Sequence, residues 1–193
     1  MSTPAPLKLL LIAGSARNGA WSVKLRDAAR AVADAGGAHT TVLDLRELAL
    51  PLYDGDIEAG QGVPAGAASL RDAMAAHDAL VLVTPEYNGF PTPLVINAFD
   101  WLSRLKDGLA TTSNKPVALL ASSPGALGGL RALNYLRQYL QMAFQMLVVP
   151  QQQAVARAHE AFAADGALAD AKAAAMLAGV INAVLTLAAQ RRS

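Results

Sequence analysis

Short apolar runs alternate along the chain with longer stretches in which apolar residues recur every three or four positions. The short runs are typical of strands buried on both faces and cover residues 7–13, 40–45, 79–84, 115–123 and 146–151. The longer stretches have helical spacing and cover residues 23–35, 67–76, 93–105, 128–145 and 168–190. This alternation predicts an α/β fold, a doubly wound sandwich with a five-stranded parallel sheet and helices on both faces.

Two segments interrupt the alternation, residues 46–64 and 152–167, and both are expected to be surface loops. We find no repeat and no linker, so residues 1–193 are expected to form a single domain. The last apolar stretch approaches the length of a membrane span. It is rich in alanine and interrupted by Asn182 and Thr186, which favours a packed helix and no membrane association.

Composition and charge narrow the possible functions. The formal net charge is +1 and no basic run is longer than Arg191–Arg192, which argues against a nucleic-acid surface. The chain has no cysteine, which excludes disulfides, cysteine–zinc sites and thiol catalysis. Its three histidines are isolated in sequence, so no metal site is expected. The absence of cysteine and the short N-terminal apolar run fit a cytoplasmic protein.

In folds of this kind, ligands bind beyond the carboxyl ends of the strands. The loop after the first predicted strand reads GSARNGAWS (14–22). Backbone amides at the start of a helix form an anion site. Ser15 and Ser22 add hydroxyls to it, and Arg17 adds a charged guanidinium with a forked set of N–H donors. The loop matches neither a Walker A motif nor G-x-G-x-x-G. The alternative is an ordinary turn in which Ser22 caps the helix.

The loops after the third and fourth predicted strands have a different chemistry. PEYNGFPTP (85–93) combines the flat ring of Tyr87 with the polar side chains of Glu86 and Asn88, a set suited to a planar heteroaromatic ligand. The alternative is a turn that ends the strand before a helix beginning near Pro93. SSPGALGG (122–129) contains three glycines, which permit close approach of a ligand.

These motifs resemble the NAD(P)H-dependent FMN reductase family, which includes quinone, chromate and azo-dye reductases. The resemblance rests on G-S-x-R (14–17), P-E-Y-N-G (85–89) and N-A-F-D-W-L-S-R (97–104), with support from residues 50–58 and 122–138. It covers roughly residues 8–150. It implies a flavodoxin-like fold with strand order 2-1-3-4-5.

The resemblance also implies a cofactor site for FMN. Its phosphate would be held by the first loop, its isoalloxazine ring by the second, mostly through backbone groups, and the third loop would approach the ring. The residues carried over in that order are Ser15, Arg17 and Ser22; Pro85, Glu86, Tyr87, Asn88 and Gly89; Ser122 and Gly125. Asn97, Asp100 and Trp101 would be structural or lie at a subunit interface, since family members are typically dimers or tetramers.

In the implied reaction, NADPH or NADH donates a hydride to flavin N5, leaves, and is replaced by a small-molecule electron acceptor. This order predicts ping-pong kinetics and needs no catalytic acid, base or nucleophile from the protein. The chain departs from the family pattern at Ala20, where serine is common, at Phe90, where a small residue is common, and at Ile96, where lysine is common.

Three alternatives to a reductase are open to the sequence. A flavodoxin-type electron carrier is disfavoured by the near-neutral charge, because such carriers tend to be strongly acidic. A regulatory oligomer without flavin is a second alternative. A phospho-accepting receiver domain would need an acidic cluster after the first and third strands, and the first strand here ends in Gly14–Ser15.

Overall fold

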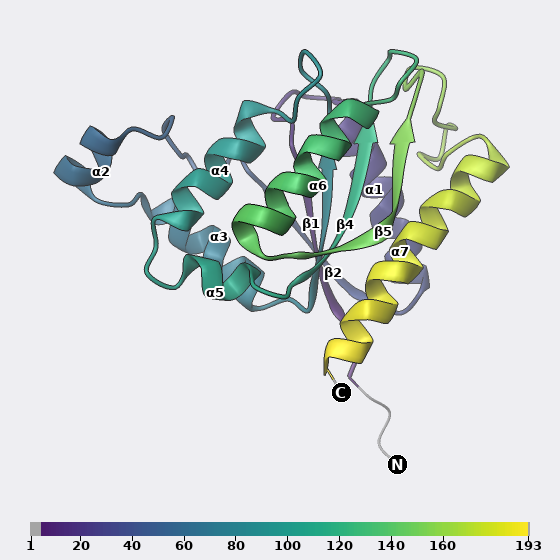
Figure 1. The fold of residues 1–193 in the computed structure, drawn as a ribbon. Helices are drawn as coiled ribbons and strands as arrows, with labels where there is room; N and C mark the ends of the chain where they lie inside the picture. The colour runs from purple at the N-terminus through teal and green to yellow at the C-terminus, as the bar shows by residue number, and fades with distance from the viewer. Residues whose placement is uncertain (1–4, 193) are drawn as a thin grey trace.

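A five-stranded parallel sheet forms the centre of the computed structural model, which describes residues 5–192 (Figure 1). The strands lie in the order β2-β1-β3-β4-β5, and every neighbouring pair is parallel. This confirms the predicted fold class and strand order. The strands are β1 (Lys8–Ala13), β2 (His39–Asp44), β3 (Ala79–Thr84), β4 (Pro116–Ser122) and β5 (Leu147–Val155).

The central strands are buried on both faces, as their continuous apolar sequences predict. All residues of β3 and β4 are buried. Because successive side chains of a strand point to opposite faces, Leu80 and Leu82 join one hydrophobic cluster while Val81 and Val83 join another. The sheet therefore separates two cores.

Helices cover both faces of the sheet. One core is closed by α3 (Ala65–Ala75), α4 (Pro93–Ser103) and α6 (Leu130–Phe144), and the other by α1 (Trp21–Ala35) and α7 (Ala171–Arg192). Each helix buries an apolar stripe, for example Leu133, Leu136 and Leu140 on α6. The carboxyl ends of the strands all reach the same edge of the sheet, at the top of Figure 1.

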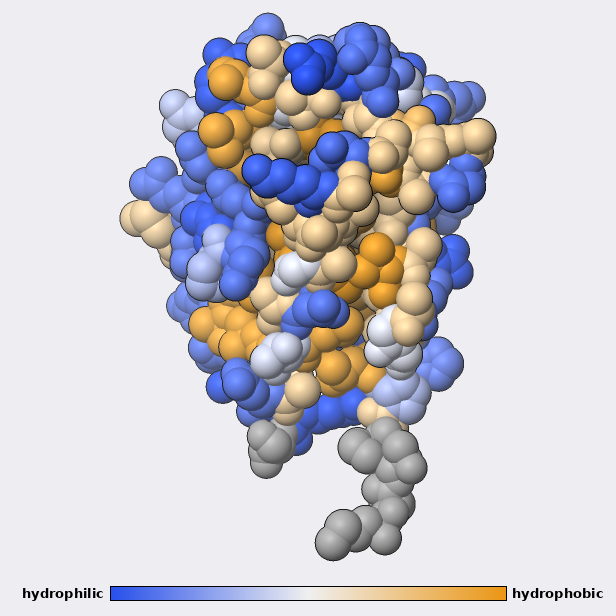
Figure 2. All heavy atoms as spheres, turned by 90° about the vertical axis from the view of Figure 1, so that its right-hand side faces the viewer, coloured by the Kyte–Doolittle hydropathy of each residue, from blue (hydrophilic) through white to orange (hydrophobic). Residues whose placement is uncertain are grey.

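The helix α7 is long and apolar enough to cross a membrane by length and composition. In this structure it packs on the sheet, as the sequence predicts, and buries Leu177, Val180, Ile181, Val184 and Ala188. Figure 2 shows the side of the molecule on which α7 lies, where apolar side chains remain at the surface among polar ones.

The structure differs from the predicted elements in the two segments expected to be loops. The first contains the short helix α2 (Gly55–Gln61), which extends away from the sheet (Figure 1). Its N-cap, Asp54, accepts a hydrogen bond from the Asp56 amide at 2.8 Å. The helix buries no residue, so it lacks the apolar periodicity by which the other helices are predicted. Outside these two segments, the structure contains another short helix that was not predicted, α5 (Gly108–Thr112).

The second of these segments begins with strand, because β5 continues to Val155 beyond its predicted end at residue 151. The pairing with β4 changes register between Val117 and Leu119, opposite the exposed Pro150. Proline cannot donate a ladder hydrogen bond and is found at such irregularities. The predicted strand ended at Gln151, whereas the chain pairs with β4 again from Gln152.

Candidate functional site

The three loops singled out from the sequence meet at the carboxyl edge of the sheet. They surround a cleft of about 190 Å³ beside the ends of β1, β3 and β4. The strand order reverses between β1 and β3, which is the position where ligands bind in open α/β sheets. The cleft is lined by Ser15, Arg17, Ala20, Trp21, Ser22, Pro85, Glu86, Tyr87, Ser122, Ser123 and Pro124.

Most of the predicted site residues are thus brought together, although they come from three separate loops. Asn88, Gly89 and Gly125 do not line the cleft. Asn88 and Gly89 form the corner of a turn next to it, and Gly125 donates its amide to the Ser123 hydroxyl at 3.2 Å.

The first loop is fixed at its start by contacts across the sheet. The Gly14 amide donates to the carbonyl of Val83 at 2.7 Å, and the Gly14 carbonyl accepts from the buried hydroxyl of Thr92 at 2.6 Å. A Cβ atom at Gly14 would lie 2.5 Å from Cγ2 of Val95. Glycine is therefore required here, because the loop passes directly against the start of α4.

The helix α1 begins beside the cleft without a capping side chain. Its N-cap is Ala20, and no side chain makes a capping hydrogen bond. The alternative in which Ser22 caps this helix is therefore wrong, because the helix begins at Trp21 and Ser22 is its second residue. Since the first amides of a helix have no intrahelical partner, this end of α1 presents hydrogen-bond donors and the positive end of the helix dipole.

Two serine hydroxyls in the cleft are buried without a partner. Oγ of Ser22 and Oγ of Ser122 make no hydrogen bond within residues 5–192, although both residues are 1% exposed. Leaving a buried hydroxyl unsatisfied costs about 1–3 kcal/mol. Ser22 lies in the first turn of α1 and Ser122 is the last residue of β4, and both residues line the same cleft. The cleft therefore suits a ligand with hydrogen-bonding groups.

Arg17 supplies the positive charge of the cleft. Its amide donates to the Ser15 hydroxyl at 3.3 Å, which holds the loop in a tight turn. Its guanidinium is exposed and makes one long contact, 3.5 Å, to the carbonyl of Asn18. No carboxylate forms a salt bridge with Arg17 among the described residues, so its charge is available to an anion.

The second loop forms both a turn and a wall of the cleft, so the two interpretations of its sequence are compatible. Tyr87 and Phe90 exchange two backbone hydrogen bonds of 3.0 Å, with Asn88 and Gly89 at φ 54° and 86° between them. Positive φ at both central positions is typical of a type I′ turn, for which Asn-Gly is the favoured sequence. The ring of Tyr87 is 50% exposed beside the cleft.

The Glu86 side chain is occupied by α6. Its carboxylate pairs with the Arg131 guanidinium, including a 2.9 Å contact to Nε, and accepts from the Ala132 amide at 3.4 Å. A carboxylate is favourable at this position because it lies at the N-terminus of the helix. Glu86 therefore anchors the turn and presents only its remaining surface and backbone to the cleft.

The sequence did not identify Ser123 and Pro124 as cleft residues, and it left the role of Trp21 open. The indole of Trp21 stacks on Phe162 with ring centroids 6.2 Å apart and planes at 6°. Lys24 lies 4.6 Å from the centroid of the Trp21 ring. Trp21 therefore joins the cleft wall to the loop that follows β5. Phe162 is distant in sequence, so no local pattern indicates this contact.

Asn97, Asp100 and Trp101 have structural roles within the chain. Asn97 Nδ2 and Trp101 Nε1 donate to the carbonyl of Pro51 at 2.8 and 2.7 Å, which ties α4 to the segment before α2. Asp100 accepts from the Tyr139 hydroxyl at 3.2 Å. Burial, and then the charge of Asp100, raise the pKa of Tyr139. None of the three lines the cleft.

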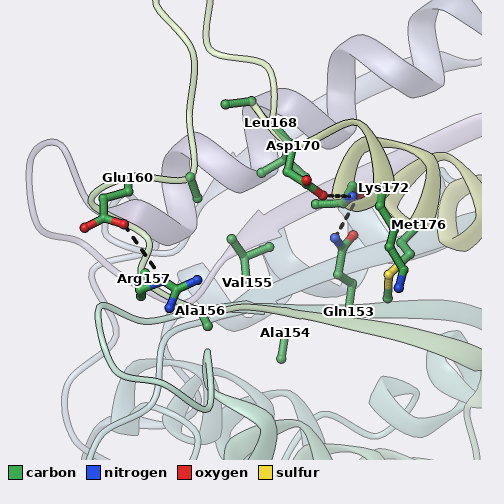
Figure 3. A pocket seen from close by; sticks show the side chains of 13 residues that line it. Gln153, Ala154, Val155, Ala156, Arg157, Glu160, Leu168, Asp170, Lys172 and Met176 are labelled. Carbon is green, nitrogen blue, oxygen red and sulfur yellow. Dashed lines mark hydrogen bonds and ion pairs between the residues drawn. The ribbon is translucent and has the colours of Figure 1, made fainter.

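A larger cavity of about 510 Å³ lies between the end of β5 and the start of α7 (Figure 3). Several of its polar groups are paired with one another. Arg157 lies 3.9 Å from Glu160, the Gln153 amide nitrogen donates to the Ala173 carbonyl at 2.9 Å, and Asp170 caps α7. Gln153 Oε1 has no partner within the described chain. The cavity borders the third loop, because the Arg157 amide donates to the carbonyl of Gly125 at 3.3 Å.

The described residues contain no group of three or more His, Asp or Glu side chains that could hold a metal ion. The residues that line the cleft offer hydroxyls, backbone amides, the guanidinium of Arg17, the paired carboxylate of Glu86 and the aromatic rings of Trp21 and Tyr87. These groups bind and orient a ligand.

Comparison with known proteins gives a consistent result. Residues 7–160 match the family described as NADPH-dependent FMN reductase. A quinone reductase of Escherichia coli (strain K12) is 37% identical over 135 residues, which cover 69% of each chain. An NAD(P)H-dependent FMN reductase of Pseudomonas aeruginosa is 35% identical over 168 residues, which cover 86% of this chain and 87% of the relative.

A solved structure supports the same relationship. The structure of FerB, a flavoenzyme NAD(P)H:(acceptor) oxidoreductase from Paracoccus denitrificans, matches with a TM-score of 0.79 and 27% sequence identity. The match covers 95% of this chain and 98% of that chain.

Proposed function

Because the chain belongs to the NADPH-dependent FMN reductase family, we propose that it binds FMN in the cleft and passes reducing equivalents from NADPH or NADH to a small acceptor. It is an oxidoreductase of the NAD(P)H-dependent FMN or quinone reductase type. Acceptors such as quinones follow from this class, and chromate, azo compounds and free flavin are further candidates. The observation that carries the FMN proposal is that two residues lining one cleft, Ser22 and Ser122, each have a buried hydroxyl without a partner within the described chain.

The residues of the first loop suit a phosphate. Ser15 and Ser22 offer hydroxyls, Arg17 offers a charged guanidinium, and the start of α1, which has no capping side chain, offers backbone amides. Charge-assisted hydrogen bonds of this kind are roughly twice as strong as those between neutral groups. Ala20 removes the hydroxyl that the family often has here, so the three other groups and the helix would carry the phosphate.

The second and third loops suit a planar ring. Tyr87 offers its face, Pro85 and Glu86 offer backbone groups, and Ser122 offers a hydroxyl from the adjacent strand end. We extend the same proposal to Asn88 and Gly89, which lie next to the cleft and would contribute through backbone atoms, and to Gly125, where the absence of a side chain would permit close approach. FMN, when bound, supplies the redox chemistry of its isoalloxazine ring. The protein would bind the ring, orient it and leave one face open to the two substrates.

The size of the cleft bears on how a cofactor would sit. Its volume of about 190 Å³ is below the roughly 300 Å³ at the lower end of typical ligand pockets. A ligand as large as FMN would therefore fill the cleft and extend onto the surface beside Tyr87. Such an exposed ring is accessible to nicotinamide and acceptor in turn, which supports the expected ping-pong order.

The test of this proposal is to purify the full chain and identify bound flavin by absorbance and mass spectrometry. NADPH and NADH oxidation would then be measured with menadione, and parallel double-reciprocal plots are expected for a ping-pong enzyme. Protein that stays colourless after incubation with FMN would contradict the cofactor assignment. Flavin-loaded protein that does not oxidise NADPH or NADH would favour the electron-carrier alternative.

We also propose that the protein is cytoplasmic and forms a homodimer or homotetramer. The family resemblance supports the oligomer. Light scattering coupled to gel filtration would measure the oligomeric state. A monomer at micromolar concentration would refute this part of the proposal without affecting the cofactor site.

A further inference from the structure

We propose that Tyr87, Phe90 and Tyr135 form an acceptor platform that favours flat, multi-ring, uncharged quinones over small or anionic acceptors, with Phe90 as the specificity determinant. This inference rests on the proposed function, because it assigns the acceptor class of the same site. Its basis is the geometry of three exposed aromatic rings, of which Tyr87 lines the cleft and Phe90 and Tyr135 lie next to each other beyond it.

The three rings are connected in space from the cleft outwards. Tyr87 lines the cleft, and Phe90 lies directly opposite it across the two backbone hydrogen bonds of the turn. Side chains of directly opposed residues project from the same side of a hairpin. The ring of Phe90 in turn contacts the ring of Tyr135 on α6, with centroids 5.0 Å apart and planes at 43°.

The exposure of these rings is unusual for side chains that only serve the core. Tyr87, Phe90 and Tyr135 are 50%, 48% and 52% exposed, and neither hydrophobic core includes them. A group of exposed aromatic side chains at the edge of a cleft is typical of a binding surface. Aromatic faces bind flat ring systems by offset stacking or edge-to-face contact.

The platform is held rigidly. The type I′ turn fixes the backbone between Tyr87 and Phe90, and the pair between Glu86 and Arg131 joins this turn to α6. Tyr135 lies one turn of α6 beyond Arg131, so the same ion pair positions both sides of the platform. A surface that is already ordered loses little entropy when it binds a ligand.

The charge of the platform favours neutral acceptors. Arg131 lies beside the turn, with Cζ 3.7 Å from a Cβ placed at Gly89, and its guanidinium is paired with the Glu86 carboxylate. The pair leaves little net charge to attract an anion such as chromate. A two-ring quinone, in contrast, can cover both the reactive end of the cleft and the ring of Phe90.

The overall reaction balances with the substrates already assigned. NADPH or NADH gives up a hydride, which carries two electrons, and one proton is taken from solvent. The quinone gains two electrons and two protons and leaves as the hydroquinone, while the oxidised nicotinamide is the other product. The platform would contribute binding to the acceptor and take no part in proton or electron transfer.

The experiment compares two acceptors that differ in ring number. Menadione has two fused rings and 1,4-benzoquinone has one, and each would be assayed with the wild type, Phe90→Ser and the conservative Phe90→Tyr. Equilibrium binding of menadione to the FMN-loaded protein without NAD(P)H would be measured by isothermal titration calorimetry. Met142→Ala is the matched control, since Met142 is 74% exposed on α6 and lies about two helical turns beyond Tyr135.

Phe90→Ser is expected to raise both KM and Kd for menadione about three- to tenfold, the loss expected for one aromatic contact. The kcat for menadione should change little, the effect on benzoquinone should be clearly smaller, and Phe90→Tyr should restore menadione binding. Met142→Ala should behave as the wild type. Gel filtration of each variant would show whether Phe90 affects association of the subunits.

Several results would overturn the platform. Equal changes for menadione and benzoquinone, or no change in the Kd of menadione, would show that Phe90 does not select by ring number. A change in oligomeric state with no change in menadione binding would assign the rings to a contact between copies of the chain. Failure of wild-type protein to bind FMN or oxidise NAD(P)H would instead refute the proposed function, and ferricyanide reduction by Phe90→Ser would show that the variant retains its redox chemistry.

Discussion

Replacing both unpartnered serines of the cleft with alanine should change stability and cofactor affinity in opposite directions. In the ligand-free protein, Ser22 Oγ and Ser122 Oγ are buried and make no hydrogen bond within the described chain. Removing a buried, unsatisfied hydroxyl should raise the free energy of unfolding by about 1–3 kcal/mol. The lost packing contacts of the oxygen atom offset a small part of this gain. The ligand-free double variant, Ser22→Ala with Ser122→Ala, is therefore expected to be as stable as the wild type or more stable.

The effect on FMN affinity follows from the hydrogen bonds that the serines would make. A hydrogen bond to a charged group such as phosphate contributes about 1.5–3 kcal/mol and one to a neutral ring atom about 0.5–1.5 kcal/mol. Loss of Ser22 should therefore weaken FMN binding by about 10- to 150-fold, and loss of Ser122 by about 2- to 12-fold.

Two assays on the same proteins would check this. Urea unfolding of flavin-free protein gives the free energy of unfolding, and titration of flavin-free protein with FMN gives the Kd. Ser69→Ala is the matched control, because Ser69 is exposed and its hydroxyl bonds only to a carbonyl of its own helix. A large loss of stability together with unchanged FMN affinity would show that the two hydroxyls serve the fold, and the reasoning would be refuted.

Two further predictions concern the fold around the site. Gly14→Ala should destabilise the protein by about 1–3 kcal/mol in urea unfolding, because its Cβ would meet Val95 at 2.5 Å. The control is Gly55→Ala, since a Cβ at Gly55 meets nothing within 4 Å. An equal loss of stability in both variants would contradict the clash at Gly14. For Tyr139, burial and the charge of Asp100 raise the pKa of the phenol above its usual 10.0. The folded protein then keeps a proton that the unfolded chain loses, so the stabilising contribution of this hydroxyl is present below pH 10 and declines above it. The stability difference between wild type and Tyr139→Phe should accordingly shrink as the pH rises above 10, and a constant difference in urea unfolding would count against the assigned cause.

The fold could be predicted largely from local sequence, because the signals that specify it are local. Continuous apolar runs identify β1, β3 and β4, since a strand buried on both faces needs no polar alternation. Gly14 and the Asn88–Gly89 pair mark turns through their own backbone preferences. The helix α2 was missed because it buries no side chain and thus leaves no periodic pattern. The second part of β5 was missed because three glutamines, residues 151–153, lie beyond the apolar run that ends at Val149.

Sequence by itself determined which loops carry the chemistry and which residue types they contribute, because residues within one loop are adjacent in the chain. The tertiary structure alone decided which of those residues share a cleft. The unpartnered state of Ser22 and Ser122, the Glu86–Arg131 pair and the contact of Phe90 with Tyr135 each depend on segments far apart in the chain. Burial and hydrogen bonding at such positions depend on how the sheet brings its strand ends together, and no local pattern contains that information.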